Sequence, residues 1–443
     1  MAPSSALRAD PSPLALGIDL GSSGLRLALV DAGGGAVAEL AAAYPLPFED
    51  PEGWRQGLIA LCAQLPADLL GRVGALALDG TSGTLLLCRP DGSRPAGRLG
   101  LALPYHQACP EQAAAALALS GGSGPAASAS GSLARALRLL AQAEAEGLAG
   151  HWRLRHQADW LMGWLLADWR WGEEGNNLRL GWDLQHQAWS GTIAQQPWRE
   201  ALPQLVPSGQ VVGTLAPEVA RQLGLPRACR LVAGSTDANA GVLAADPRPG
   251  DGIAVLGTTL VLKQFCGRPI QGPGLSCHRV AGRWLVGGAS NAGGGVLRRF
   301  FSDDQLAELS RQIDPRRPSG LALRPLPRPG ERFPVDDPAL EPVLEPRPVS
   351  DALYLQALLE GLAAIEAEGW RRLAQLGAPP LRRVISIGGG ARNPQWRALR
   401  QRLLGVPVLN RPHCSAALGM ARLAAAALAL PGRQDGATPS PPP

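Results

Sequence analysis

Two hydrophobic periods alternate along this chain, and together they predict a mixture of strands and helices. Between Leu14 and Glu39, apolar runs are broken by the turns GSSG and AGGGA, which predicts an antiparallel meander. Within 253–265, the runs IAVL and LVLKQF flank a GTT turn and repeat the order of strand, small-residue turn and strand. We interpret the repeat as an internal duplication that places one such hairpin at the start of each half.

Helices are predicted where apolar residues recur every three to four positions. The Gly, Ser and Ala stretch at 120–132 predicts a flexible surface connection, and ten prolines between Asp314 and Ser350 exclude regular structure there. The glycines at 388–390 predict a turn after a buried strand at 384–387. The predicted helices cover 54–67, 111–119, 133–146, 157–167, 351–376, 394–404 and 415–430.

The length of 443 residues exceeds what one hydrophobic core usually organises, so two domains are expected, at 14–232 and 233–430. With 46% hydrophobic and 18% charged residues, the composition is typical of a soluble globular protein. No apolar run reaches the roughly 18 residues that a membrane span needs, so no membrane association is expected. The flanks 1–13 and 431–443 are predicted to be a disordered leader and tail.

Charge and cysteine usage exclude several classes of function. The net charge of +5 is small and its arginines are scattered, so nucleic acid is not expected as a partner. The seven cysteines form no C-x-x-C, which disfavours disulfides and zinc sites and favours a cytoplasmic location. Lys263 is the only lysine, which excludes a Walker P-loop and a protein-kinase site. A bound nucleotide would therefore need another device.

The turns of the two hairpins are candidates for that device. Gly-Ser-Ser-Gly, with Ser22, Ser23 and Gly24, and the turn Gly257-Thr258-Thr259 present backbone N–H groups and small hydroxyls to one side, which suits phosphate oxygens. A single turn of this kind is more typical of a purely structural role, but two turns at equivalent places favour a nucleotide held from both sides.

Two carboxylates are candidates for the chemistry. Asp19 precedes the first turn, where it could bind Mg²⁺ next to the phosphates or hydrogen-bond the N–H groups of its own turn. Asp237 lies in Gly-Ser-Thr-Asp between a strand and a helix, where it could act as a general base or only cap the helix. Gly389 and Gly390 would let a flat base approach, with Asn393 and Trp396 contacting it, although Trp396 could equally belong to the core.

From Leu14 to about Leu430 these residues resemble the FGGY carbohydrate kinase family. The segments that carry the resemblance are GIDLGSSGLRLALVD, ALALDGTSGTLLL, GSTDANAGVLAA, AVLGTTLVLK, VGGASNAGG, GERFP and ISIGGGARNPQW. Within the family, GGASNAGGGVLRRFFSDDQL, GERFP and RQRLLGVPV look most like the cyanobacterial and plant plastid D-ribulose kinases.

The resemblance implies an α/β fold of two ribonuclease-H-like, actin-type domains with ATP and sugar in the cleft between them. It implies Asp237 as catalytic base and Asp19 as the carboxylate for phosphate and metal. Sugar contacts would come from the 19–24 turn, which holds Ser22, Ser23 and Gly24, and from Ser82 and Asp237. The nucleotide would contact Ser22, Ser23, Gly257, Thr258, Thr259, Gly389, Gly390, Asn393 and Trp396. The family's W-x-D-x-R motif is absent, and LALPYHQAC stands in its place.

The sequence therefore predicts an ATP- and Mg²⁺-dependent kinase, a monomer or homodimer, that converts D-ribulose to D-ribulose 5-phosphate. D-xylulose or another ketose or polyol is the alternative acceptor. An actin-like or heat-shock-type ATPase that drives partner binding is the alternative of another class, because the same hairpins would serve it. A sugar-binding protein without turnover is a third reading, which the presence of Asp19 and Asp237 disfavours.

Overall fold

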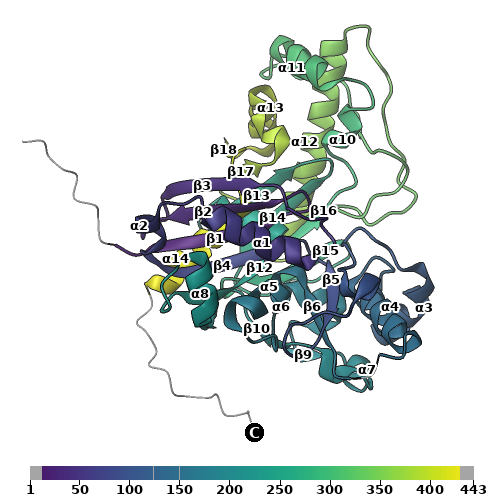
Figure 1. The fold of residues 1–443 in the computed structure, drawn as a ribbon. Coiled ribbons are helices and arrows are strands. Elements are labelled where there is room, and N and C mark those ends of the chain that lie inside the picture. The colour runs from purple at the N-terminus through teal and green to yellow at the C-terminus, as the bar shows by residue number, and fades with distance from the viewer. Residues whose placement is uncertain (1–11, 123, 149, 430–443) are drawn as a thin grey trace, which may run out of the picture.

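Two six-stranded mixed sheets form the framework of the protein, one in each lobe, in the computed structural model (Figure 1). The structure describes residues 12–122, 124–148 and 150–429. The predicted tail, and the predicted leader apart from its last two residues, lie outside this part of the chain.

The first sheet has the order β11-β12-β4-β1-β2-β3. One half of it is the predicted meander, in which β1 pairs antiparallel with β2 and β2 with the edge strand β3, so this prediction is confirmed. Strand β4 lies parallel to β1, and β12 lies parallel to β4. The bounds are β1 Leu14–Leu20, β2 Leu25–Val30, β3 Ala36–Ala42, β4 Val73–Gly80, β11 Val211–Thr214 and β12 Arg230–Thr236.

The second sheet, with the order β15-β16-β14-β13-β17-β18, repeats this arrangement. Strand β13 pairs antiparallel with β14 and parallel with β17, just as β1 pairs with β2 and β4. The equivalence supports the duplication inferred from the two hairpins. The bounds are β13 Asp251–Leu256, β14 Leu260–Cys266, β15 Leu275–Val280, β16 Arg283–Ala289, β17 Arg383–Ile387 and β18 Val408–Asn410.

Two helices, α9 (Asp237–Ala244) and α14 (Ala416–Leu428), pack against each other in a shared core that includes residues of both sheets. They approach so closely that a Cβ on Gly419 would lie 1.9 Å from the carbonyl oxygen of Ala240. Strand β12 belongs to the first sheet and α14 packs on β1, so the expected boundary between residues 232 and 233 needs correction. The expected boundary divides strand β12. The chain crosses to the second lobe only after β12, and its last helix, α14, returns to the first lobe.

The remainder of the first lobe covers the first sheet and extends beyond it. Helix α1 starts at Pro51, earlier than predicted, because Asp50 caps it by accepting a hydrogen bond from the Glu52 N–H (3.0 Å). The helices are α1 Pro51–Cys62, α2 Ala67–Leu70, α3 Ala113–Leu119, α4 Ser132–Ala145, α5 Gln157–Leu166, α6 Glu174–Asn177, α7 Gly191–Ala194 and α8 Pro217–Leu223, with 3₁₀ turns η1 Gly97–Gly100, η2 Pro110–Gln112, η3 Leu178–Leu180 and η4 Arg199–Ala201. The short strands are β5 Leu85–Cys88, β6 Arg153–His156, β7 Trp171–Glu173, β8 Trp182–Asp183, β9 Ala188–Trp189 and β10 Gln204–Val206.

The second lobe confirms the predicted helix after Ser350, whose hydroxyl accepts a hydrogen bond from the Leu353 N–H. The proline-rich stretch before it contains only isolated bridges and turns, yet Phe333 is 1% exposed and lies in the core of this lobe. The helices are α10 Gly294–Leu297, α11 Asp303–Gln312, α12 Asp351–Gln375 and α13 Pro394–Leu404, with the 3₁₀ turn η5 Gly389–Arg392. Within the described residues, the helices include none with the length and hydrophobicity of a membrane span.

Candidate active site

Asp19 and Asp79 lie side by side at the ends of two adjacent strands. They are direct partners in the parallel register of β1 and β4, and they are 4% and 0% exposed. The Arg26 guanidinium, on the neighbouring strand β2, donates to Asp19 Oδ2 at 2.8 Å. Neither interpretation of Asp19 included this ion pair. The carboxylate is held by a cation across the hairpin.

The Asp79 carboxyl is the more unusual member of this pair. Neither of its oxygens has a hydrogen-bond partner among the described residues. Burial, reinforced by the negative charges of Asp19 and Asp237, raises the pKa of Asp79 well above its usual range. Two buried carboxyl groups, one without partners, fit a site that a cation or a nucleotide-bound cation would complete.

Asp237 is the first residue of α9, and Thr236 occupies the N-cap position. Its Oδ1 accepts a hydrogen bond from the Ala238 N–H at 2.7 Å, so part of its role is to stabilise the start of the helix. Burial and the charge of Asp19 raise the pKa of Asp237, and the charge of Lys263 opposes the shift. A carboxylate with a raised pKa is suited to accept a proton near neutral pH.

The two predicted phosphate turns lie at the tips of equivalent hairpins. Ser22, Ser23 and Thr258 are exposed there, so their side-chain hydroxyls are accessible to a ligand. The second turn is supported from behind, because the Gly294 and Gly295 N–H groups donate to the carbonyls of Gly257 and Thr258 at 2.9 and 3.0 Å.

The predicted adenine residues surround the turn after β17. Gly389 is exposed, and a Cβ there would meet nothing within 4 Å. Asn393 caps α13, since its Oδ1 accepts from the Trp396 N–H at 3.0 Å. Trp396 is 4% exposed, and its ring lies 2.4 Å from where a Cβ on Gly390 would be. The structure thus favours the core interpretation of Trp396, which supports the glycine turn from below.

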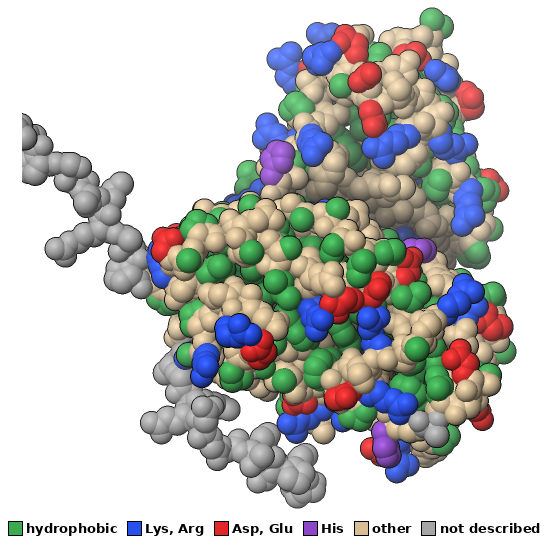
Figure 2. Space-filling view, viewed as in Figure 1, with side chains coloured by type: hydrophobic (Ala, Val, Ile, Leu, Met, Phe, Trp, Pro, Cys, Tyr) green, Lys and Arg blue, Asp and Glu red, His purple; other side chains and the backbone are tan. Residues whose placement is uncertain are grey.

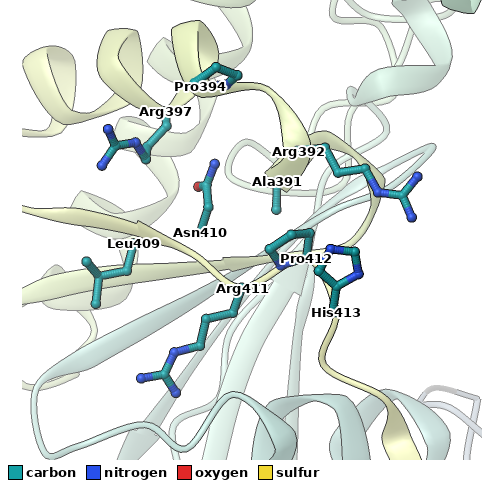
Figure 3. Close-up of a pocket in the computed structure, with 9 residues that line it drawn as sticks. All are labelled: Ala391, Arg392, Pro394, Arg397, Leu409, Asn410, Arg411, Pro412 and His413. Carbon is teal, nitrogen blue, oxygen red and sulfur yellow. The ribbon is translucent and has the colours of Figure 1, made fainter.

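A pocket of about 650 Å³ adjoins this turn (Figure 3). Arg392 follows the glycines, and Arg411 and His413 come from the loop after β18. The parallel strands β17 and β18 end at the same edge, which is where ligands collect in open α/β sheets. The full lining is Ala391, Arg392, Pro394, Arg397, Leu409, Asn410, Arg411, Pro412 and His413.

A larger cavity of about 850 Å³ is lined by residues of both lobes, and Figure 2 shows the surface hollowed between the upper lobe and the rest of the molecule. Ser82 and Arg179 contribute from the first lobe, and Lys263 and His278 from the second. Thr236 and Ala238, the neighbours of Asp237, also line it. The cavity therefore extends to the first turn of α9, where the candidate base lies. The tryptophans of the first lobe differ in their surroundings: Trp182 lines this cavity, whereas Trp160 is buried in the hydrophobic core.

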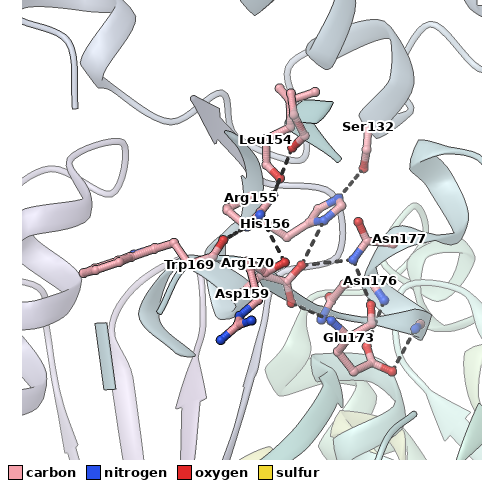
Figure 4. A network of polar contacts seen from close by, with 12 residues as sticks. Ser132, Leu154, Arg155, His156, Asp159, Trp169, Arg170, Glu173, Asn176 and Asn177 are labelled. Carbon is pink, nitrogen blue, oxygen red and sulfur yellow. Dashed lines mark hydrogen bonds and ion pairs between the residues drawn. The ribbon is translucent and has the colours of Figure 1, made fainter. Parts of the chain in front are cut away.

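A buried polar network holds the segment that carries Arg179 (Figure 4). Asp159 accepts hydrogen bonds from the Glu173 N–H (2.9 Å) and from Asn177 Nδ2 (3.0 Å), and Glu173 in turn caps α6. Burial raises the pKa of Glu173 to about 8. His156 Nε2 lies 2.9 Å from Ser132 Oγ at the other end of the network. The network fixes α6 and η3 at the wall of the cavity.

One ion pair joins the lobes beside the cavity. Arg279 of β15 contacts Glu174 of α6 in a bidentate arrangement, with Nη2 to Oε1 at 2.6 Å and Nε to Oε2 at 3.1 Å. The Glu174 side chain is 4% exposed. Because the two groups come from opposite lobes, next to the cavity-lining residues Gly175 and His278, the pair stabilises the relative position of the lobes there.

Sequence reasoning missed four side chains of this site: Asp79, Arg179, Lys263 and Arg26. The segments LGIDLG and LALDGT each end a strand in Asp-Leu-Gly or Asp-Gly, and this parallel could have pointed to Asp79. The rarity of lysine could have pointed to Lys263. Arg179 carries no local signal, because only the tertiary fold brings it near Ser82.

The described residues contain no cluster of three or more His, Cys, Asp or Glu side chains that could hold a metal by themselves. Mg²⁺ commonly uses one or two carboxylates together with substrate phosphates. Asp19 and the partnerless Asp79 fit that requirement.

One family model matches most of the second half of the chain. Residues 253–428 match the model of the C-terminal domain of the FGGY family of carbohydrate kinases. The narrower likeness to D-ribulose kinases is not part of this match.

Solved structures show the same fold over nearly the whole chain. A xyloylose kinase from Brucella ovis is similar with a TM-score of 0.77, 23% identity, and coverage of 94% of this chain and 91% of that one. A xylulose kinase from Bifidobacterium adolescentis has a TM-score of 0.74 and 21% identity, with coverage of 95% of this chain and 93% of that one. A gluconate kinase from Lactobacillus acidophilus has a TM-score of 0.76 and 16% identity, with coverage of 94% of this chain and 90% of that one. The predicted α/β fold with two actin-type domains is thereby confirmed.

Proposed function

We propose that this protein is an ATP- and Mg²⁺-dependent carbohydrate kinase that phosphorylates a free pentulose, D-ribulose, at its terminal hydroxyl. The observation that carries the proposal is that Asp19 and Asp79 are register partners whose charges act on or with Asp237, while Thr236 and Ala238, on either side of Asp237, line a cavity walled by both lobes. The match of residues 253–428 to a carbohydrate-kinase domain supports the reaction class.

In this proposal Asp237 is the general base. Its carboxylate accepts the proton of the acceptor hydroxyl while that oxygen forms a bond to the γ-phosphorus, and ADP leaves with the electron pair of the broken P–O bond. The raised pKa of Asp237 favours proton acceptance, and the Ala238 N–H keeps the carboxylate oriented.

The two hairpin turns and the carboxyl pair would hold the triphosphate. Ser22, Ser23, Thr258 and Thr259 supply hydroxyl and N–H donors from opposite lobes. Mg²⁺, when bound at Asp19 and Asp79, would neutralise charge on the phosphates. The adenine and ribose of ATP would lie at the glycine turn. Gly389, Gly390 and Asn393 would be on one side, and the pocket of Arg392, Arg411 and His413 lies beside the turn.

The acceptor would occupy the larger cavity, with Ser82 and Arg179 as contacts from the first lobe. The segment 101–109 stands where the family motif W-x-D-x-R is expected, and it lacks that motif's charges. Arg179 Nη1 lies 3.9 Å from where a Cβ on Gly83 would be, next to Ser82. Arg179 would therefore supply the acceptor site with a positive charge in place of the one that the missing motif provides. The choice of D-ribulose is supported by the resemblance of 287–306, 330–334 and 400–408 to D-ribulose kinases.

The test is ADP release with a panel of acceptors: D-ribulose, D-xylulose, L-ribulose, gluconate, glycerol and water alone. We expect the highest kcat/KM with D-ribulose, and a 5-phosphate as the product by ³¹P and ¹³C NMR. A higher kcat/KM with another sugar would refute the assignment of the acceptor. ADP release at the same rate without any sugar would refute the kinase and favour the ATPase.

A further inference from the structure

Lys263 is the only lysine of the chain, and it is 6% exposed on β14 in the second lobe. Its Nζ donates to Asn239 Oδ1 at 2.7 Å and approaches the carbonyl oxygen of Ala238 at 3.5 Å. Asn239 Nδ2 donates in turn to Ser235 Oγ at 3.2 Å. The ammonium is thus tied to the two residues that follow Asp237.

The hydrogen-bond partners of Lys263 are neutral, which is costly for a buried cation unless a negative charge is close. Asp237, at the start of α9, is the acid whose charge acts on Lys263. On β15, burial together with the Lys263 charge lowers the pKa of His278 to about 3, so that imidazole is neutral near pH 7. On β1, Asp19 adds negative charge at Asp237. Lys263 is therefore the cation that compensates Asp237, whereas Arg26 pairs with Asp19.

Lys263 also lines the larger cavity, together with Thr236 and Ala238 on either side of Asp237. An ammonium has three N–H donors, and the two contacts to α9 leave one of them available toward the cavity. A hydrophobic side chain would fill the same space in a simple packing role. A lysine at this place instead links the acceptor cavity, the first turn of α9 and the charge state of the base.

We propose that Lys263 is a positioning residue for the base: its ammonium fixes the first turn of α9 through Asn239 and keeps Asp237 in the ionised form that proton acceptance requires. This inference rests on the proposed role of Asp237. Lys263 itself gains and loses no proton during the reaction, in which the hydroxyl proton moves to Asp237 as the new P–O bond forms.

The first experiment uses the single lysine and does not depend on activity. Protein grown with ¹³Cε-lysine gives one lysine signal, whose shift against pH reports the charge of Lys263. We expect a midpoint of about 8 in the wild type, because burial lowers the pKa of Lys263. Asp237→Asn removes the stabilising anion, so the midpoint should fall by about one pH unit. An unchanged midpoint would overturn the proposal.

The second experiment measures the pH profile of kcat/KM with the best acceptor. Below its pKa Asp237 is protonated and activity falls; above about 8 Lys263 loses its charge and activity falls again. Lys263→Met should move the acid limb up by about one pH unit, because the carboxylate loses its cation. Lys263→Arg should keep the acid limb and abolish the alkaline limb, since arginine stays charged.

Arg283→Met is the matched control. Arg283 lies on the adjacent strand β16 and stacks on Phe265 at 3.9 Å, so the variant removes a nearby cation that does not act on Asp237. It should leave both limbs unchanged.

An alkaline limb that persists in Lys263→Arg, or an acid limb that does not move in Lys263→Met, would overturn the proposal. If Lys263→Met fails to fold, the arginine variant and the lysine signal still decide it. If no acceptor is phosphorylated, a shifted lysine signal still supports the coupling while the proposed function fails.

Discussion

Asp237→Asn separates the proton-accepting role of this side chain from its role at the start of α9. The amide oxygen can still accept the hydrogen bond from the Ala238 N–H, which is 2.7 Å from Asp237 Oδ1, so the helix should start at the same residue. The amide cannot accept the proton of the acceptor hydroxyl. Positioned general bases contribute about 10²- to 10⁴-fold to rates, so we expect kcat to fall by about a thousandfold, which corresponds to about 4 kcal/mol of barrier.

The stability of the folded protein should not fall together with kcat in Asp237→Asn. Because the pKa of Asp237 is raised in the folded protein, folding disfavours the ionised form. Stability therefore falls as the pH rises from the usual carboxyl value of about 4 through the raised value. A neutral amide removes this penalty but also removes the anion that acts on the buried Lys263 ammonium, so Asp237→Asn should melt at the same temperature as the wild type at pH 4, and the two effects should largely offset each other at pH 7.

The assay couples ADP release to NADH oxidation, with ATP affinity measured by calorimetry and melting followed by circular dichroism. Asp246→Asn makes the same chemical change in an exposed residue just beyond the other end of α9, and it should behave as wild type. A kcat within tenfold of wild type in Asp237→Asn would refute the general-base role. A large loss of ATP affinity together with a lower melting temperature would show that the variant disturbs the fold, and the reasoning on the helix start would be wrong.

Three further substitutions test other parts of the structure. Arg400→Met leaves Glu366 buried without the guanidinium that contacts it at 2.5 and 2.8 Å, so urea denaturation should show a loss of about 3–5 kcal/mol; a loss below about 1 kcal/mol would contradict this. Gly390→Ala places a methyl 2.4 Å from the Trp396 ring, so stability should fall by about 1–3 kcal/mol and calorimetry should show weaker ATP binding; unchanged ATP affinity would separate the glycine turn from the nucleotide. Arg179→Met should raise KM for the acceptor roughly tenfold to a hundredfold in steady-state kinetics with ATP affinity unchanged, and an unchanged KM would remove Arg179 from the acceptor site.

Local signals in the sequence were sufficient for the individual elements. The hairpin at 14–30 and its repeat at 253–265 followed from alternating apolar runs and small-residue turns, and the long helix after Ser350 followed from its cap and its 3.6-residue period. These features depend on residues only a few positions apart. The same holds for Asp19 and Asp237, because each stands next to a recognisable turn or helix start.

Only the tertiary structure decided how distant residues combine. Parallel pairing of β1 with β4 sets Asp79 beside Asp19, and the packing of α12 and α13 buries Trp396 although it neighbours the glycine turn. Arg179 lines the larger cavity beside α6, which a buried network anchors, and Lys263 of β14 contacts the first turn of α9 through Asn239. A local signal could have singled out Asp79 or Lys263 as residues, but none predicts their contacts, since each contact depends on chain closure over tens of residues and on which faces are buried. The sequence therefore determined the kinds of element and two of the carboxylates, while burial and strand pairing determined the charges around them.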